Sequence, residues 1–192
     1  MKSKSTFFKI KLIVVTLLAS LVIFSCGTEL QLYEWETMDL RLLNTQTRDT
    51  LTVNAEIEAS NFSILVSLNP ENSIKVRSSD WVNYSQGFQA NDNIESLEIT
   101  SNQDYNDIFP EGELLNDVFD AAFINEPETR LPLDLFLESF GKETNRIEEG
   151  FELLPNIVGE GAPRDSLRRF IIRLELEKNG TFLKTTENVR IF

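Results

Sequence analysis

Histidine is absent from this 192-residue chain, and cysteine occurs once, as Cys26. Without histidine the chain cannot form a Ser-His-Asp or Cys-His catalytic group, a histidine-ligated metal site or a histidine pH switch. A single cysteine cannot close a disulfide within the chain, so the fold depends on its apolar core. Fourteen phenylalanines and many aliphatic residues make such a core feasible at this length.

Basic residues are scarce, with 18 against 31 acidic ones and a formal net charge of −13 at pH 7. Four of the 18 lie in residues 1–25, which hold no acid, so the rest of the chain has 14 basic and 31 acidic residues and a formal charge of −17. A surface of this charge repels phosphate backbones, and we expect no nucleic-acid partner. The acidity is also typical of an exposed surface that is simply soluble.

Long apolar runs are limited to residues 12–24. That run is too short for a transmembrane helix, which needs about 20 apolar residues. Lysines precede it and Ser25-Cys26 follows it, as in the signal peptide of a bacterial lipoprotein. An ordinary secretory signal needs no cysteine at its cleavage point. We therefore expect cleavage before Cys26 and attachment of lipid, palmitate included, to this cysteine.

This interpretation predicts three regions, namely a signal peptide over residues 1–25, a lipidated tether over 26–36 and a single domain over 37–192. A tether of about ten extended residues reaches about 33–36 Å, which clears the lipid headgroups and keeps the domain near the membrane. Gly27 follows the cysteine. In envelopes where aspartate at this position retains lipoproteins in the inner membrane, a glycine predicts sorting to the outer membrane.

Apolar and polar residues alternate along much of the domain, which is the pattern of half-buried strands. The pattern predicts strands over residues 38–42, 51–59, 62–68, 74–77, 97–100, 172–177 and 189–191. Asn179-Gly180 is the favoured sequence of a two-residue type I′ hairpin turn. Such a turn pairs Lys178 with Thr181 and places Leu176 opposite Leu183 on the core side.

Two segments in the middle of the chain have helical spacing instead. In residues 114–123 the apolar face consists of Leu115, Val118, Phe119 and Ala122. In residues 132–140 it consists of Leu133, Phe136, Leu137 and Phe140, although a buried strand also fits this segment. The whole pattern predicts a mainly β fold, an antiparallel immunoglobulin-like β-sandwich with one or two short helical insertions.

Two tripeptides are candidates for covalent modification. Asp49-Thr50-Leu51 and Asp165-Ser166-Leu167 resemble the Asp-Ser/Thr-apolar sequon of periplasmic O-glycosylation in Bacteroidota. The resemblance implies Thr50 and Ser166 as the acceptors. A turn aspartate followed by the start of a strand explains the same tripeptides without modification.

Aromatic and polar residues supply further candidates. Trp81 and Tyr84 lie in a stretch without periodicity, and they indicate either an exposed platform for a ligand such as a sugar or a cap on one end of the sandwich. Asp104-Tyr105-Asn106-Asp107 offers oxygen ligands of the kind that calcium takes, but it lacks the glycine and the terminal glutamate of an EF-hand. A solvated loop is the simpler interpretation, and we expect no metal and no cofactor.

A pair of carboxylates can hydrolyse glycans without histidine. The chain has many acids, among them Glu111, Glu113, Asp117, Asp134 and Glu138. The sequence alone pairs none of them, and polar faces and helix starts account for most. We therefore expect no catalytic residue.

The chain resembles the small lipoproteins of unknown function that are abundant in Bacteroidota. The resemblance lies in four segments: the lipoprotein cleavage motif Ile23-Phe24-Ser25-Cys26, residues 59–64, residues 99–115 and the final hairpin. The resemblance implies the fold and the cell envelope, and no site residues. The expected function is a non-enzymatic, membrane-anchored binding or accessory module for an envelope protein or a glycan. The alternatives are a carboxylate-based glycan hydrolase and a structural subunit of an envelope transport or secretion assembly.

Overall fold

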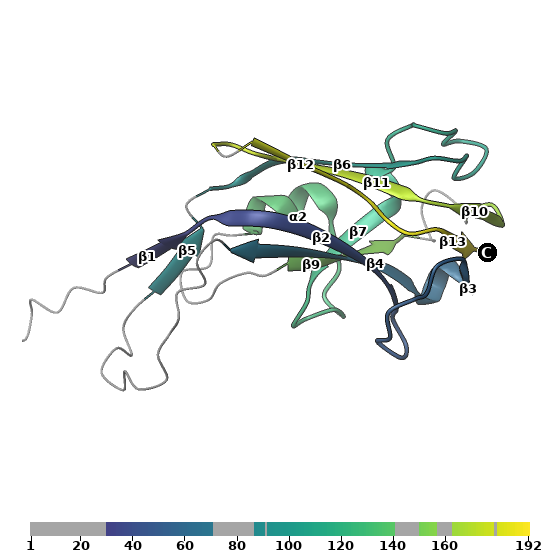
Figure 1. Cartoon of the computed structure of the whole chain (residues 1–192), viewed down its shortest axis with the longest axis horizontal. Coiled ribbons are helices and arrows are strands. Elements are labelled where there is room, and N and C mark those ends of the chain that lie inside the picture. Colours follow the sequence, from purple (N-terminus) through teal and green to yellow (C-terminus); the bar gives the residue numbers. More distant parts are fainter. Residues whose placement is uncertain (1–29, 71–86, 91, 141–149, 157–162, 179) are drawn as a thin grey trace, which may run out of the picture.

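The computed structural model describes residues 30–70, 87–90, 92–140, 150–156, 163–178 and 180–192. Outside these residues lie the predicted signal peptide with Cys26, the predicted strand over 74–77, and Trp81 and Tyr84. The described part of the chain is mainly β, with mostly antiparallel sheets and one α-helix (Figure 1). The predicted mainly β, antiparallel fold class is therefore confirmed.

Two antiparallel sheets form the body of the domain and lie as two layers (Figure 1). The larger sheet has the strand order β2–β4–β9–β7–β8, with β2 (Trp35–Asn44), β4 (Phe62–Pro70), β9 (Gly150–Pro155), β7 (Phe119–Phe123) and β8 (Leu131–Pro132). The smaller sheet has the order β12–β11–β6, with β12 (Gly180–Thr185), β11 (Phe170–Leu176) and β6 (Ile94–Ser101).

Shorter elements complete the fold. A third sheet joins β10 (Ser166–Arg168), β13 (Val189–Ile191) and β3 (Ala55–Ile57), and β1 (Leu30–Tyr33) runs parallel to β5 (Gly87–Ala90). The helices are α2 (Leu133–Ser139) and the 3-10 turns η1 (Ala59–Asn61) and η2 (Asn116–Val118). The β1–β5 pair lies at one end of the long axis and the C-terminus at the other (Figure 1).

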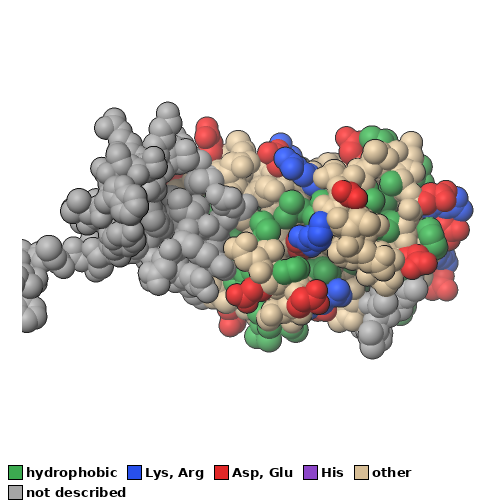
Figure 2. All heavy atoms as spheres, turned by 90° about the horizontal axis from the view of Figure 1, so that it is seen from below, with side chains coloured by type: hydrophobic (Ala, Val, Ile, Leu, Met, Phe, Trp, Pro, Cys, Tyr) green, Lys and Arg blue, Asp and Glu red, His purple; other side chains and the backbone are tan. Residues whose placement is uncertain are grey.

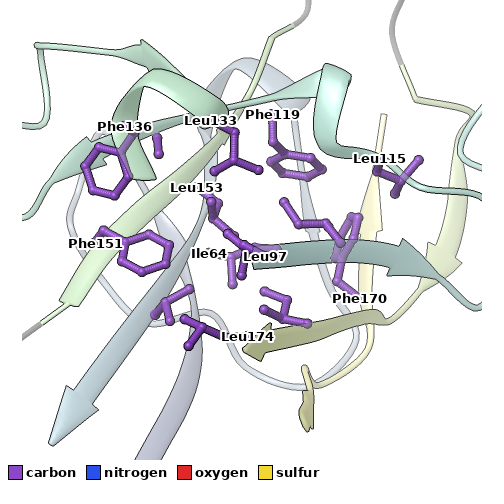
Figure 3. Close-up of a cluster of buried hydrophobic side chains, with 14 of the residues drawn as sticks. Ile64, Leu97, Leu115, Phe119, Leu133, Phe136, Phe151, Leu153, Phe170 and Leu174 are labelled. Carbon is purple, nitrogen blue, oxygen red and sulfur yellow. The ribbon is translucent and has the colours of Figure 1, made fainter. Parts of the chain in front are cut away.

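The core lies between the two large sheets because their strands bury alternate residues. Ile64, Val66 and Leu68 of β4 face the core from one side, and Ile172 and Leu174 of β11 face it from the other. The buried helix face adds Phe136, and Figure 3 shows it beside Phe151 in the same cluster as residues from both sheets. The predicted strands over 38–42, 62–68, 97–100 and 172–177 and the helix over 132–140 are confirmed in these places.

Two strands occupy part of the predicted tether over residues 26–36. Residues 30–33 form β1, and β2 starts at Trp35. The Trp35 side chain is buried, and its ring stacks on that of Phe140 with the centroids 5.7 Å apart. The tryptophan thus belongs to the core of the domain.

The predicted strand over residues 51–59 is wrong except at Ala55–Ile57, which is β3. Asn54 adopts a left-handed conformation with φ at 61°, and this interrupts an extended strand. The N–H of Ala55 then closes a turn by donating to the carbonyl of Thr52. Val53, predicted to be buried, is 55% exposed on that turn.

The predicted helix over residues 114–123 is also wrong. The segment contains the 3-10 turn η2 followed by strand β7. All four residues of the predicted apolar face, Ala122 included, are buried, but Ala121 is buried as well, which does not fit a single helical face. Pairing of β7 with β9 supplies the backbone hydrogen bonds, and this long-range pairing overrides the local helical spacing.

The predicted hairpin register is wrong by three residues. Leu176 pairs with Gly180, and Leu183 lies opposite Arg173 instead of Leu176. Because a shift by an odd number turns a strand over, Leu183 is 63% exposed. The N–H of Lys178 donates to the Asp92 carboxylate at 3.1 Å, so the turn is bound by the segment before β6 rather than by the hairpin ladder.

The predicted strand over residues 189–191 is confirmed as β13, but in the third sheet. It pairs with β10 and β3 and not with the hairpin strand β12. Val189 and Ile191 are buried there. This sheet closes the end of the domain where the C-terminus lies (Figure 1).

Candidate functional site

A cleft of about 960 Å³ opens at one side of the domain, where the edge of β6 faces β8 and α2. Its inner wall is apolar and is made by the buried side chains of Ile94, Leu97, Phe119, Leu133 and Phe140. Leu137, half-buried, adds to this wall from α2. The cleft thus lies between the edge of the smaller sheet, formed by β6, and the helix α2.

Six carboxylate residues line the same cleft, at positions Glu95, Asp117, Asp120, Asp134, Glu138 and Glu177. All except Asp120 are exposed. No lysine or arginine is among the described residues that line the cleft. On the face of the molecule in Figure 2, by contrast, basic and acidic side chains lie close to one another. The cleft therefore favours ligands that carry positive charge.

Hydrogen bonds fix one wall of the cleft, and burial of apolar residues fixes the other. The side-chain amide of Asn116 donates to the carbonyl of Leu97 at 2.6 Å and accepts from the N–H of Ile99 at 3.0 Å. Asn116 therefore attaches η2 to the edge of β6. The opposite wall begins at Pro132, whose restricted φ suits the residue before a helix, and the buried Leu133 and Phe136 hold α2 on the core.

Asp120 differs from the other carboxylates of the cleft because it is partly buried on β7. Burial raises the pKa of Asp120 above its ordinary value, against the opposing effects of the Arg130 charge and of a hydrogen bond from the Asn156 side chain. The protonated form of this carboxyl group therefore persists to a higher pH than that of an exposed aspartate. A carboxyl group of this kind can donate a proton to a bound ligand.

Two further polar groups are buried elsewhere. Glu152 of β9 accepts hydrogen bonds from both terminal nitrogens of Arg48 and from the hydroxyl of Ser63. Arg168 of β10 is fully buried, lies over the Tyr105 ring and donates to the backbone carbonyls of Tyr105 and Arg164. Neither group lines the cleft.

The predicted modification sites lie apart from the cleft. Thr50 is exposed and pairs with Leu43 through an isolated bridge next to the Arg48 turn. Ser166 is half-buried on β10, and its hydroxyl accepts a hydrogen bond from Arg168 at 2.8 Å. O-glycosylation of Thr50 and Ser166 stays a prediction, and exposure favours Thr50 as the acceptor.

The segment considered for calcium forms a loop that Arg164 holds. Its guanidinium pairs with the carboxylates of both Asp104 and Asp107. Asp104 also accepts a hydrogen bond from the backbone N–H of Glu111 at 2.9 Å. Among the described residues no group of three or more potential metal ligands occurs. These carboxylates already have partners within the protein.

The structure brings together some of the acids that the sequence singled out and separates others. Asp117, Asp134 and Glu138 line the cleft, whereas Glu111 and Glu113 lie on an exposed loop outside it. Sequence reasoning missed Asp120, because the predicted helix over residues 114–123 placed it away from the apolar face, whereas the structure has it on strand β7. It also missed Asn116, since an asparagine after a leucine gives no sign that its amide covers a strand edge.

No family model, curated protein or solved structure matches this chain. In the described part of the chain, no helix has the length and apolar character that crossing a membrane requires.

Proposed function

We propose that this protein is a membrane-anchored envelope lipoprotein that binds a positively charged partner, a protein or a glycan, in the acidic cleft without turning it over. The anchor is the predicted lipid on Cys26, which precedes β1 by only a few residues. The proposal extends to an outer-membrane location, to the Bacteroidota-type lipoprotein family and to an immunoglobulin-like arrangement of the two main sheets.

The observation that carries the binding proposal is the composition of the cleft. Its carboxylates provide attraction and orientation for a cation, beside a wall of apolar residues that are already buried in the core. The charge of the cleft also predicts how binding depends on salt. The attraction between exposed charges weakens as salt shortens the Debye length from about 10 Å at 0.1 M to about 3 Å at 1 M. Binding in the cleft should weaken accordingly.

A crosslinked pull-down from native envelopes tests the proposal. The full-length protein is compared with the cleft variant Asp134→Asn/Glu138→Gln and with the control variant Glu111→Gln/Glu113→Gln. Both variants remove two exposed carboxylates, but only the first pair lines the cleft. We expect the cleft variant to capture its partner severalfold less than wild type and the control variant to equal wild type.

Equal capture by wild type and the cleft variant would contradict the proposal. Capture of a component of a transport or secretion assembly in a cleft-dependent manner would make the protein an accessory subunit of that assembly. Repeating the capture at increasing salt adds an independent readout, since a charge-driven partner is lost as salt rises.

A second candidate function is carboxylate-based hydrolysis of a glycan, and the raised pKa of Asp120 favours it. Asp120 would serve as the general acid, with another cleft carboxylate as the base or the nucleophile. Turnover of an envelope glycan that Asp120→Asn abolishes, and that falls as pH rises through the raised pKa of Asp120, would establish this function. Absence of turnover with a glycan that binds in the cleft would exclude it.

A further inference from the structure

Strand β6 is the outer strand of its sheet, and only part of its free edge is covered. It pairs with β11 on one side, and among the described residues no strand pairs with its other side. Toward its end, the free side accepts hydrogen bonds from segment 112–115, with the N–H of Gly112 donating to Ser101 and that of Leu115 to Ile99. The side-chain amide of Asn116 then donates to the carbonyl of Leu97. Leu97 is the last residue of the covered part of the edge.

The direction of the backbone groups follows from these bonds. Within a strand, the N–H and C=O of one residue point to the same side. Since the carbonyl of Leu97 points to Asn116, the N–H of Leu97 points to the free side too, and no partner for it is found in the described part of the chain. In the β6–β11 pair, Glu175 lies opposite Ser96 and Leu176 lies opposite Ile94, so a bulge at Glu95 interrupts this part of the edge. The open part of the edge therefore runs from Ile94 to Leu97 and includes the bulge.

The acidic cleft lies along this open edge. Residues 94–97 form one side of the cleft, and α2 forms the opposite side. A strand added to the sheet here has one face toward the buried wall, which includes Leu97, Leu133 and Phe140. The exposed carboxylate residues Glu95, Asp117 and Glu138 line the same cleft.

We propose that the partner enters the cleft as an extended peptide segment that adds a strand to β6 at residues 94–97 and alternates apolar residues with lysine or arginine. Main-chain hydrogen bonds to the open edge supply the affinity of such a strand, and alternate side chains supply its specificity. The apolar side chains cover the buried wall, and the basic ones pair with the exposed carboxylates. An extended segment of four residues spans about 13 Å.

This inference rests on the proposed function and selects a peptide over a glycan. A glycan carries hydroxyl groups without the alternating N–H and C=O groups of a strand, and so it cannot continue the ladder of β6. The distinguishing feature is periodicity, because only every second amide of an added strand donates to the edge.

The experiment uses the full-length protein and a displayed library of random eight-residue peptides. Enriched peptides are synthesised in three forms: unmodified, with N-methyl groups on alternate amides, and with N-methyl groups on the intervening amides. We expect enriched sequences to alternate apolar and basic residues. We expect one methylated series to bind at least tenfold more weakly and the other to bind like the unmodified peptide. The Leu97 amide should also become protected from hydrogen exchange when the peptide binds.

The cleft variant Asp134→Asn/Glu138→Gln should weaken peptide binding severalfold, and the control Glu111→Gln/Glu113→Gln should not change it. No enrichment, enrichment without alternation, or equal effects of both methylated series would overturn the inference. If the methylated series behave alike while the cleft variant still loses its envelope partner, the strand inference fails and the proposed function stands. If the cleft variant keeps its envelope partner, the proposed function fails.

Discussion

Buried polar side chains are few in the described structure, and each makes at least one hydrogen bond, although the Nε of Arg168 has no partner there. Glu152 is ion-paired with Arg48, Asp92 accepts the N–H of Lys178, and Arg168 is held by backbone carbonyls. Such groups stabilise the fold only while their partners are present, since an unpaired buried charge lowers the free energy of unfolding. The residues whose change has the largest predicted effects are therefore polar as well as apolar.

The buried phenol of Tyr105 should make the protein less stable at high pH. It is almost fully buried against Phe119 and Arg168, and burial raises the pKa of Tyr105 to about 12, although the charge of Arg168 opposes the shift. Since the folded protein holds the phenol proton more tightly than the unfolded chain, this contribution is complete below pH 10 and is lost as pH rises toward 12. We expect the free energy of unfolding to fall by about 2 kcal/mol over that interval.

Urea unfolding between pH 9 and pH 12 measures this effect, and Tyr105→Phe is the control. The variant keeps the ring over Arg168 and removes the titrating group. Its unfolding free energy should therefore fall less steeply with pH than that of wild type. Parallel curves for the two proteins would show that ionisation of Tyr105 is not linked to folding.

Because Arg48 pairs with the buried Glu152, replacing Arg48 should destabilise the fold much more than replacing an exposed arginine such as Arg41. Glu152 is completely buried and Arg48 is its charge partner, so Arg48→Ala leaves a buried carboxylate with the Ser63 hydroxyl as its remaining hydrogen-bond donor. We expect a destabilisation of about 2 kcal/mol or more. Arg41→Ala removes an exposed arginine of β2 and should change stability by less than about 0.5 kcal/mol. Thermal unfolding of both variants tests the prediction, and similar melting temperatures would refute it.

At the scale of elements, the pairing of β4 with β9 depends on a single glycine. Gly150 has φ at 147°, and a Cβ atom built on it would lie 2.0 Å from the carbonyl oxygen of Val66. The obstacle is backbone, which cannot rotate away as a side chain can. Gly150→Ala should therefore shift one of the two strands and destabilise the domain by at least about 3 kcal/mol.

Gly112 provides the matched control for this prediction. Its φ is 81°, but no atom lies within 4 Å of the position that a Cβ would take. Gly112→Ala carries only the backbone strain and should cost about 1 kcal/mol. Chemical unfolding of the two variants separates steric exclusion from strain. Equal destabilisation would mean that the β4–β9 approach tolerates a methyl group.

For the whole molecule, the predicted lipid on Cys26 determines where the protein is found. We expect wild type to sediment with membranes and to incorporate a clickable palmitate analogue. Cys26→Ser should remove the label and leave the β-rich domain unchanged, because β1 and every later element follow the cysteine. Fractionation and labelling of the two forms test this prediction. Labelling of Cys26→Ser equal to wild type would disprove it.

Much of the fold could be predicted from local patterns. The strands over residues 62–68 and 172–177 were found from their alternation, since one face of each packs on the core and the other does not. The helix over 132–140 was found from its spacing. The prediction for segment 51–59 was wrong because Asn54 adopts a left-handed conformation. The prediction for segment 114–123 was wrong because β7 pairs with β9 as a strand. Both are decided by contacts that residue order does not contain.

The candidate site was predictable only in part. Asp117, Asp134 and Glu138 were recognised as acids, but their common location depends on the edge of β6 meeting α2. The hairpin illustrates the same limit, since Asn179-Gly180 predicted a turn but not the observed register, in which Leu176 lies opposite Gly180. Turn chemistry acts over a few residues, whereas register depends on which groups the fold brings into hydrogen-bond reach.

The sequence by itself determined the anchor prediction, the excess of acid, the exclusion of histidine chemistry and the mainly β class, because each follows from composition or from spacing along a few residues. Tertiary structure alone decided that six carboxylates meet beside an apolar wall and that β6 leaves part of its edge open. The physical reason is that a cleft and a free strand edge are made by residues from several elements. Their meeting is set by how the two sheets and α2 pack.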